Sequence, residues 1–156
     1  MKPKHPSTLE GHAGYWLRCL SNFVSETFAG KVERAGVSVA QWVVLRTLYD
    51  ASDVTLNEAA EKVGVDKSSL SRMIERLVQK GLVTREEGGD RRSVSLSLSA
   101  EGRGLVPRLA ALADENDAAF FGVLSAAERK ALLGMIHKLL DVNGWDVSRR
   151  GRDRME

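Results

Sequence analysis

Residues 55–98 most constrain what this 156-residue chain can fold into, because two short amphipathic helices are followed there by a β-ribbon. The first helix is predicted to open at Thr55, which forms a capping box with Glu58 three residues later. Asp66 is placed to cap a second helix, and Gly81 suits the left-handed position that ends it. The apolar positions of the second helix follow the spacing of a one-sided stripe: Leu70, Met73, Ile74, Leu77 and Val78.

A β-ribbon is predicted directly after the second helix. Its first strand covers residues 82–86, and a polar turn follows over residues 87–90. In its second strand Val94, Leu96 and Leu98 alternate with serines, as expected for a half-buried strand. The order helix, helix, ribbon is the one that a winged helix-turn-helix requires, and this order points to DNA binding.

The polar face of the second helix has the chemistry of a major-groove reader. Short hydroxyl groups let the backbone approach phosphates and base edges, and arginines reach guanine acceptors or backbone oxygens. Arginines at the ribbon turn suit a narrow minor groove, whose negative potential attracts guanidinium groups. A solvated amphipathic helix is the alternative for the helix alone, so the argument depends on helix and ribbon together. The predicted DNA-binding residues are Lys67, Ser68, Ser69, Ser71, Arg72, Arg76, Arg85, Arg91 and Arg92.

These elements resemble the MarR (multiple-antibiotic-resistance regulator) family of bacterial transcription factors, and the resemblance covers nearly the whole chain. It implies that Arg91 or Arg92 enters the minor groove. It also implies that Asp66, by pairing with Arg92, and Asp90 in the wing turn orient the wing against the recognition helix. The segments that carry the resemblance are residues 39–46, 56–60, 65–72, 77–83, 90–94 and 99–102.

The segments outside this unit are also predicted to be helical. Helical spacing of apolar residues predicts helices over about residues 14–35 and 101–122, and Pro107 is expected to kink the second of these. Ser125 and Glu128 form a capping box for a last helix. These helices carry more apolar surface than one small winged lobe can cover, so we expect a second copy of the chain to bury it. The resemblance implies the same, a twofold dimer interlocked through the first, fifth and sixth helices.

We therefore predict a mainly α-helical fold with a small β-ribbon, in which a winged helix-turn-helix lobe is joined to N- and C-terminal dimerisation helices. The lobe is assigned to residues 38–98, where Ser38 begins a capping box for its first helix. The dimerisation helices are assigned to residues 12–36 and 100–143. Residues 144–156 form a basic tail, which we expect to be flexible.

Composition excludes several classes of protein. The formal net charge is only +2, so the placement of the arginines matters more than the total charge. The single cysteine, Cys19, excludes an internal disulfide and fits a reducing compartment. The sequence shows no signal peptide and no apolar run of membrane-span length, so we expect a cytoplasmic protein without a membrane partner.

Signals for catalysis or for a cofactor are missing from the sequence. His5, His12 and His137 are widely scattered, so we predict no metal site and no other cofactor. The sequence has no glycine-rich phosphate loop, no nucleophile elbow and no cluster of catalytic histidines. We therefore do not predict an enzyme.

A homodimer would present two recognition helices to a pseudo-palindromic operator on double-stranded DNA. We interpret the chain as a repressor of a nearby promoter, released when a small ligand changes the separation of the two DNA lobes. Aromatic walls with an arginine would suit an anionic aromatic effector. The alternative is that the tryptophans belong to the core and the arginines pair with local acids. The resemblance implies a regulatory pocket where the first two helices meet the DNA lobe, and the ligand-binding residues predicted there are His12, Tyr15, Trp16, Arg18, Trp42 and Arg46.

Two other functions stay open at the level of sequence. A relative in this family senses organic peroxides through a cysteine near the start of its first helix, but the matching position here is near Gly14 rather than Cys19. Free cysteines are more often small buried hydrophobes, and burial is what we expect of Cys19. A nonspecific architectural DNA-binding protein would instead show a steep salt dependence with little operator preference.

Overall fold

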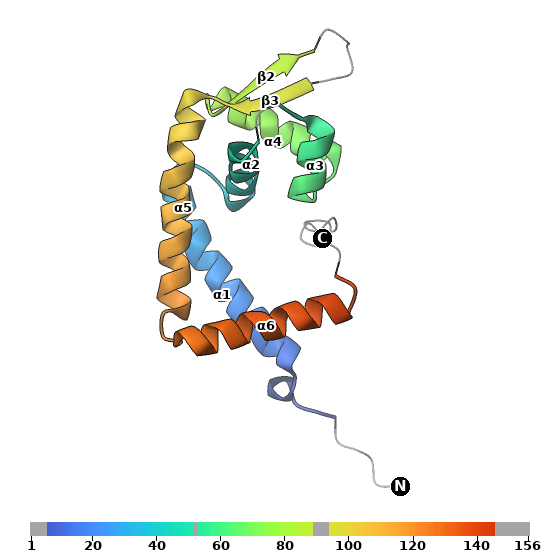
Figure 1. The fold of residues 1–156 in the computed structure, drawn as a ribbon, viewed down its shortest axis with the longest axis vertical. Helices are drawn as coiled ribbons and strands as arrows, with labels where there is room; N and C mark the ends of the chain where they lie inside the picture. Colours follow the sequence, from blue (N-terminus) through green and yellow to red (C-terminus); the bar gives the residue numbers. More distant parts are fainter. Residues whose placement is uncertain (1–5, 52, 89–93, 146–156) are drawn as a thin grey trace.

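The computed structural model describes residues 6–51, 53–88 and 94–145 (Figure 1). It is mainly helical, with one small antiparallel sheet, as the sequence predicts. The elements, in chain order, are the 3-10 helix η1 (Leu9–Gly11), α1 (Ala13–Arg34), α2 (Val39–Tyr49), β1 (Val54–Thr55), α3 (Leu56–Val63), α4 (Lys67–Gln79), β2 (Val83–Glu87), β3 (Val94–Leu98), α5 (Ala100–Phe121) and α6 (Ala126–Val142).

Helix α4 and the β2–β3 hairpin stand in the order of a winged helix-turn-helix. The strand order is β1-β3-β2, with both pairs antiparallel, and Val83 of β2 lies opposite Leu98 of β3. In Figure 1 the hairpin projects from one end of the chain, while α1 and α5 extend away from the lobe and α6 lies at the far end. The predicted DNA-binding lobe and α6 therefore lie toward opposite ends of the molecule.

Side-chain caps fix where the helices begin. Complete capping boxes open α2 at Ser38, α3 at Thr55 and α6 at Ser125, and all three are confirmed predictions. The Asp66 carboxylate caps α4, and the Ser99 hydroxyl caps α5. Each cap satisfies backbone N–H groups that the first turn of a helix leaves without a partner, so these boundaries follow from local sequence.

The core lies mainly inside the lobe. Leu45 and Leu48 of α2, Leu70 and Leu77 of α4, and Leu96 of β3 are all completely buried. At about 25 cal/mol per Å² of apolar surface, burying a leucine contributes roughly 1.5–3 kcal/mol. These side chains therefore hold α4 and the sheet in place.

The terminal helices are much less covered. Only Val32 is buried in α1, and α6 has no buried residue. Both helices expose large apolar side chains, namely Trp16, Leu17, Leu20 and Phe23 on α1 and Leu133, Met135, Leu139 and Val142 on α6. Phe23 packs edge-on against Phe120 of α5, but most of both faces stays uncovered within the described part of the chain.

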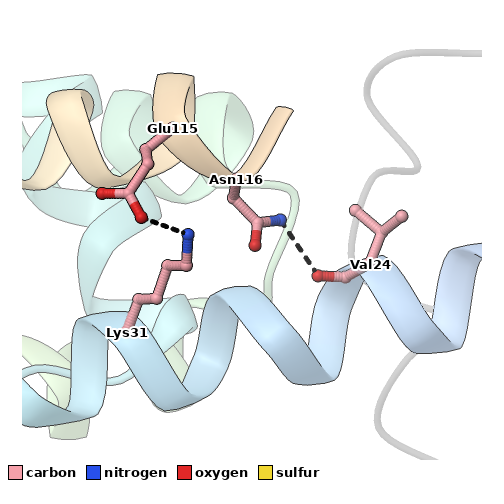
Figure 2. A network of polar contacts seen from close by, with 4 residues as sticks. All are labelled: Val24, Lys31, Glu115 and Asn116. Carbon is pink, nitrogen blue, oxygen red and sulfur yellow. Dashed lines mark hydrogen bonds and ion pairs between the residues drawn. The ribbon is translucent and has the colours of Figure 1, made fainter. Parts of the chain in front are cut away.

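Polar contacts join α1 to α5, as Figure 2 shows. The Lys31 Nζ atom donates to Glu115 Oε1 at 2.8 Å, and the Asn116 side-chain amide donates to the Val24 carbonyl oxygen at 3.2 Å. Asn116 is only 3% exposed, and its own carbonyl oxygen has no hydrogen-bond partner among the described residues. A buried bond of this kind favours one register of α5 against α1.

Several sequence expectations are corrected by the structure. Strand β1 was not predicted; it pairs with β3, so the ribbon is part of a three-stranded sheet. Val78 is 39% exposed although it belongs to the apolar stripe of α4, because the stripe is wider than the surface that α4 packs against. Cys19 is exposed rather than buried, because it lies in the stretch of α1, residues 16–23, whose side chains are all at the surface of this chain.

Pro107 does not end α5, which runs without interruption from Ala100 to Phe121.

No helix among the described residues combines the length and the hydropathy that a membrane span needs.

Candidate nucleic-acid interface

The candidate interface begins with the start of α4, where Asp66 occupies the capping position. Asp66 Oδ1 accepts from the Ser69 backbone N–H at 2.9 Å, and Asp66 Oδ2 accepts from the Ser69 hydroxyl at 2.5 Å. Before it, Gly64 adopts the left-handed conformation (φ 76°) that ends α3 and turns the chain into α4. The turn between the two helices is thus fixed from both sides.

The buried face of α4 decides which residues point outward. Leu70, Ile74 and Leu77 are in the core, so residues on the opposite face lie at the surface. Ser68, Arg72 and Arg76, spaced four residues apart, form one line along that face. Lys67, Ser68, Arg72 and Arg76 are exposed, whereas Ser69 and Ser71 are half-buried.

Arg85 occupies a different position from the α4 residues. It is exposed on β2 and lies opposite Leu96, a fully buried residue of β3. Residues paired across an antiparallel ladder project from the same face of the sheet, so Arg85 projects on the side that covers the core. Glu86 and Glu87 follow it on the same strand.

The remaining wing residues lie outside the described residues. These are Asp90, Arg91 and Arg92, and the predicted pairing of Asp66 with Arg92 lies outside them too. Within the described part, the Asp66 carboxylate is bonded to Ser69 of its own helix.

The hydrogen bonds at Asp66 have a consequence for pH dependence. The Ser69 hydroxyl, followed by the Ser69 backbone N–H, holds the pKa of Asp66 below its ordinary value. A lowered pKa means that Asp66 stabilises the fold above its unfolded pKa of about 4, and that this stabilisation is lost as pH falls through the lowered value.

We therefore expect Asp66→Ala to lower the melting temperature more at pH 7 than at the lowest pH at which the protein stays folded. The reason is that the wild-type carboxylate takes up a proton as pH falls through its lowered pKa, and it then no longer caps α4 as an anion. Thermal unfolding followed by circular dichroism would measure both values. Glu61→Ala, which removes an exposed carboxylate from α3, is the matched control. An equal loss at both pH values would contradict the assignment of Asp66 as a charged cap.

The residues predicted to bind a ligand form two separate groups in the chain. His12, Tyr15, Trp16 and Arg18 lie at the start of α1, where the Trp16 indole N–H donates to the Glu10 carbonyl oxygen at 2.9 Å. Trp42, on α2, is half-buried with its ring edge-on to Phe28. Phe28 follows Trp16 by twelve residues, roughly 18 Å along a helix. The structure of one chain therefore does not bring the two groups together.

Arg46 forms a local ion pair, which the sequence analysis gave as the alternative to ligand binding. Its guanidinium lies 2.6 Å from the Asp50 carboxylate one turn later and stacks over the Tyr49 ring. The described residues contain no group of three or more histidine, cysteine, aspartate and glutamate side chains that could hold a metal ion.

Two cavities border the end of α4, a region that the sequence did not single out. One has a volume of about 440 Å³ and the other about 580 Å³, and Lys80 lines both. Neither cavity is lined by a predicted ligand-binding residue. Lys80 belongs to a segment that carries the resemblance, but no role was predicted for it, because a lysine at a helix end is usually a solvated charge.

Comparison with protein families gives a direct match for the lobe. The sequence profile of the MarR family matches residues 35–93, which span α2 to the wing. The transcriptional regulator HosA of Escherichia coli O157:H7 is 28% identical over 135 residues, covering 86% of this chain and 98% of HosA. The transcriptional repressor MdtR of Bacillus subtilis is 34% identical over 87 residues, covering 55% of this chain and 56% of MdtR.

Solved structures show the same architecture. The Bordetella bronchiseptica protein BpsR, whose DNA binding is regulated by 6-hydroxynicotinic acid, has a TM-score of 0.76 and 27% identity, covering 87% of this chain and 99% of BpsR. A MarR variant from E. coli in complex with operator DNA has a TM-score of 0.73 and 25% identity, covering 81% of this chain and 92% of that one. The Staphylococcus aureus MepR–DNA complex, at 22% identity and a TM-score of 0.76, shows likeness of fold; it covers 84% of this chain and 98% of MepR.

Proposed function

Because this chain belongs to the MarR family of transcriptional regulators, we propose that it acts as a homodimeric repressor, released from a pseudo-palindromic operator by a small ligand. Family membership makes it a DNA-binding regulator rather than an enzyme. In this proposal residues 38–98 read DNA, and residues 12–36 and 100–143 form the dimer. The 144–156 tail is a basic extension, and its residues 146–156 lie outside the described residues.

The observation that carries the proposal is the polar line on α4. Ser68, Arg72 and Arg76 face outward from a helix whose other side is anchored in the core. A helix presented in this way fits the major groove, where arginine binds guanine and serine approaches the backbone. Since the hairpin projects beside it, helix and wing can contact the major groove and a neighbouring minor groove together.

The proposed dimer is supported by the apolar faces of α1 and α6. Phe23 is 63% exposed and Leu139 is 58% exposed, and each lies in a row of similarly exposed apolar side chains. Monomeric proteins rarely expose contiguous apolar surface of this kind, and such surface commonly marks an interface. A second copy of the chain would bury it and place two α4 helices about one turn of DNA apart, roughly 34–36 Å.

The experiment that tests this function is selection of binding sites from random duplexes, followed by footprinting on DNA around the protein's own gene. The proposal expects an inverted repeat in the selected sequences and one protected region over a promoter. A steep salt dependence without an inverted repeat would instead identify a nonspecific architectural protein.

Release by an effector needs its own measurement. The relative BpsR is regulated by 6-hydroxynicotinic acid, an anionic aromatic compound of the class expected here, so it is the test ligand. The proposal places the pocket on α2, where Trp42 and Arg46 lie, because one chain does not bring the start of α1 to it. A loss of operator affinity with this compound in wild type, but not in Trp42→Ala, would support it. A ligand can shift DNA affinity only if it binds the free and DNA-bound conformations unequally.

A further prediction concerns the wing. Arg91→Ala is expected to weaken operator binding and to reduce the salt slope of log K by roughly one unit, because one cation near the phosphates no longer displaces a counterion. Thermal stability should be nearly unchanged. Fluorescence anisotropy at several salt concentrations measures the slope. Arg108→Ala, which removes an exposed arginine from α5, is the matched control. An unchanged slope for Arg91→Ala would remove that residue from the interface.

A further inference from the structure

Lys80 joins the end of the recognition helix to the corner between α1 and α2. It is the C-cap residue of α4, and its Nζ atom donates to the Gly36 carbonyl oxygen at 2.7 Å and to Gln41 Oε1 at 3.1 Å. Gly36 belongs to the turn that ends α1, and Gln41 lies in the first turn of α2. One side chain therefore connects α4 to the consecutive helices α1 and α2, across 44 and 39 residues of sequence.

The acceptors at this corner suit an ammonium group. The last turn of α1 leaves carbonyl oxygens that carry the negative end of its helix dipole, and a cation placed there is stabilised. The Gly36 turn is itself ordered, because Gly36 N–H donates to Glu33 O at 2.9 Å and Val37 N–H donates to Val32 O at 3.2 Å. Lys80 thus binds a fixed acceptor rather than a mobile one.

The second acceptor is equally constrained. Gln41 is 7% exposed, and its Oε1 atom also accepts from the Ser38 backbone N–H at 3.1 Å as part of the capping box of α2. A charged donor strengthens each of these hydrogen bonds. A movement of the end of α4 larger than the lysine stem can follow would therefore break two bonds to ordered acceptors.

Lys80 lies at the surface, between two open hollows. The cavity of about 440 Å³ lies on one side, lined also by Leu82 and Arg108, and the cavity of about 580 Å³ lies on the other, lined also by Arg76 and Gln79. Among the described residues, the hydrogen bonds that cross from the α4 end to the α1–α2 corner are those of Lys80. Val37, Leu77 and Leu82 pack into the core beneath this corner, so the two bonds of Lys80 act together with that packing to set the angle of α4.

We propose that Lys80 is a positioning residue that fixes the orientation of the recognition helix relative to the dimerisation helices, and so sets the half-site spacing that the dimer accepts. This inference depends on the proposed dimeric operator binding. In a twofold dimer a small rotation at each lobe changes the separation of the two α4 helices twice over. If the end of α4 is not held at the α1–α2 corner, the dimer binds the operator with the correct half-site spacing less tightly. It also discriminates less against operators with a different spacing.

The test compares three variants on selected duplexes. Lys80→Met keeps the length of the stem but has no donor, and Lys80→Arg keeps charge and donors. Lys31→Met is the matched control, because it removes a lysine that joins α1 to α5 through Glu115. Lys80→Met should lose about 2- to 30-fold in affinity for the operator. It should bind a single half-site as wild type does and discriminate less against operators lengthened or shortened by one base pair. Lys80→Arg should have wild-type operator affinity and wild-type discrimination between spacings. Lys31→Met should keep wild-type discrimination.

A second readout does not depend on DNA. Nitroxide labels at Glu26→Cys on α1 and Glu75→Cys on α4, in a Cys19→Ser background, report the distance between the two helices by pulsed electron resonance. Mixing with excess unlabelled chain isolates the distance within one chain. The distribution should broaden with Lys80→Met and stay narrow with Lys31→Met.

The outcomes separate this inference from the proposed function. If wild type selects no inverted repeat, the dimeric operator function fails, and the label distances alone then decide whether Lys80 fixes the helix orientation. An unchanged distance distribution in Lys80→Met overturns the inference. It is also overturned by equal losses on half-site and full operator with a salt slope lower by about one, since this pattern identifies a phosphate contact.

Discussion

Glutamate at Leu20 and Leu139 together should convert the protein to a monomer and weaken binding to a full operator by about 10²- to 10⁴-fold, the usual gain from linking two binding sites. Leu20 lies on the exposed face of α1 and Leu139 on that of α6, at 42% and 58% exposure. In one chain a glutamate at either position stays in water, so folding of the chain is not penalised directly. In a dimer the same carboxylates would be buried against apolar surface, which costs several kcal/mol each. Sedimentation equilibrium measures the association, and anisotropy measures the operator affinity.

Two controls test whether the lost operator affinity comes from lost dimerisation. Val123→Glu changes an apolar residue that is 84% exposed but lies in the turn between α5 and α6, outside both apolar faces. Wild type should also show an unfolding midpoint that rises with protein concentration, as a coupled dimer must. Deletion of residues 125–156 should leave the remaining surface without its partner and give a poorly soluble chain. A soluble double variant that remains dimeric, with undiminished operator affinity, would refute the interlocked arrangement.

The fold of the lobe is largely predictable from sequence because its signals are local. The capping boxes at Ser38, Thr55 and Ser125 depend on residues three apart, and each is present in the structure. The stripe from Leu70 to Leu77 identifies the buried face of α4 for the same reason. Strand β1 escapes prediction because Val54–Thr55 is only two residues long. Its strand character comes from pairing with Leu96 and Ser95, which are 42 and 40 residues away from their partners.

In the candidate site, too, features with local signals are predictable from the sequence and long-range contacts are not. Helical periodicity alone places Arg72 and Arg76 on the outer face of α4, and the structure has both exposed. The contacts of Lys80 could not be inferred, since Gly36 and Gln41 are 44 and 39 residues away in sequence. Burial of Cys19 was inferred from residue type, and residue type fails where a helix face finds no partner in its own chain.

The predicted ligand-binding residues form one site only if the start of α1 lies close to α2. Helical periodicity gives no information about the distance between two helices. Trp16 and Trp42 both looked like pocket walls, yet in one chain Trp16 bonds to Glu10 while Trp42 contacts Phe28. Local sequence indicates which side chains of a helix could line a pocket. Only the tertiary structure determines which helices lie close enough to line the same pocket.

Arg72→Ala is expected to cost about 1–3 kcal/mol of operator affinity, or roughly 5- to 150-fold, if its guanidinium binds a guanine through two hydrogen bonds. Arg72 is exposed at the middle of the outward line of α4, one turn from both Ser68 and Arg76. On random duplexes the loss should be smaller, because nonspecific binding depends on phosphates rather than base edges. Anisotropy on the selected operator and on random DNA gives both values.

The conservative substitution separates base reading from charge. Arg72→Lys keeps the positive charge but lacks the planar fork that matches guanine, so it should bind random DNA as wild type does and still lose affinity for the operator. Selection with Arg72→Ala should relax the preference at one base pair in each half-site and leave the others unchanged. Arg103→Ala, an exposed arginine on α5 beside Tyr49, is the control that should change neither. Equal losses for Arg72→Ala on operator and random DNA, with no relaxed position, would assign Arg72 to a phosphate and leave base reading to other residues of α4.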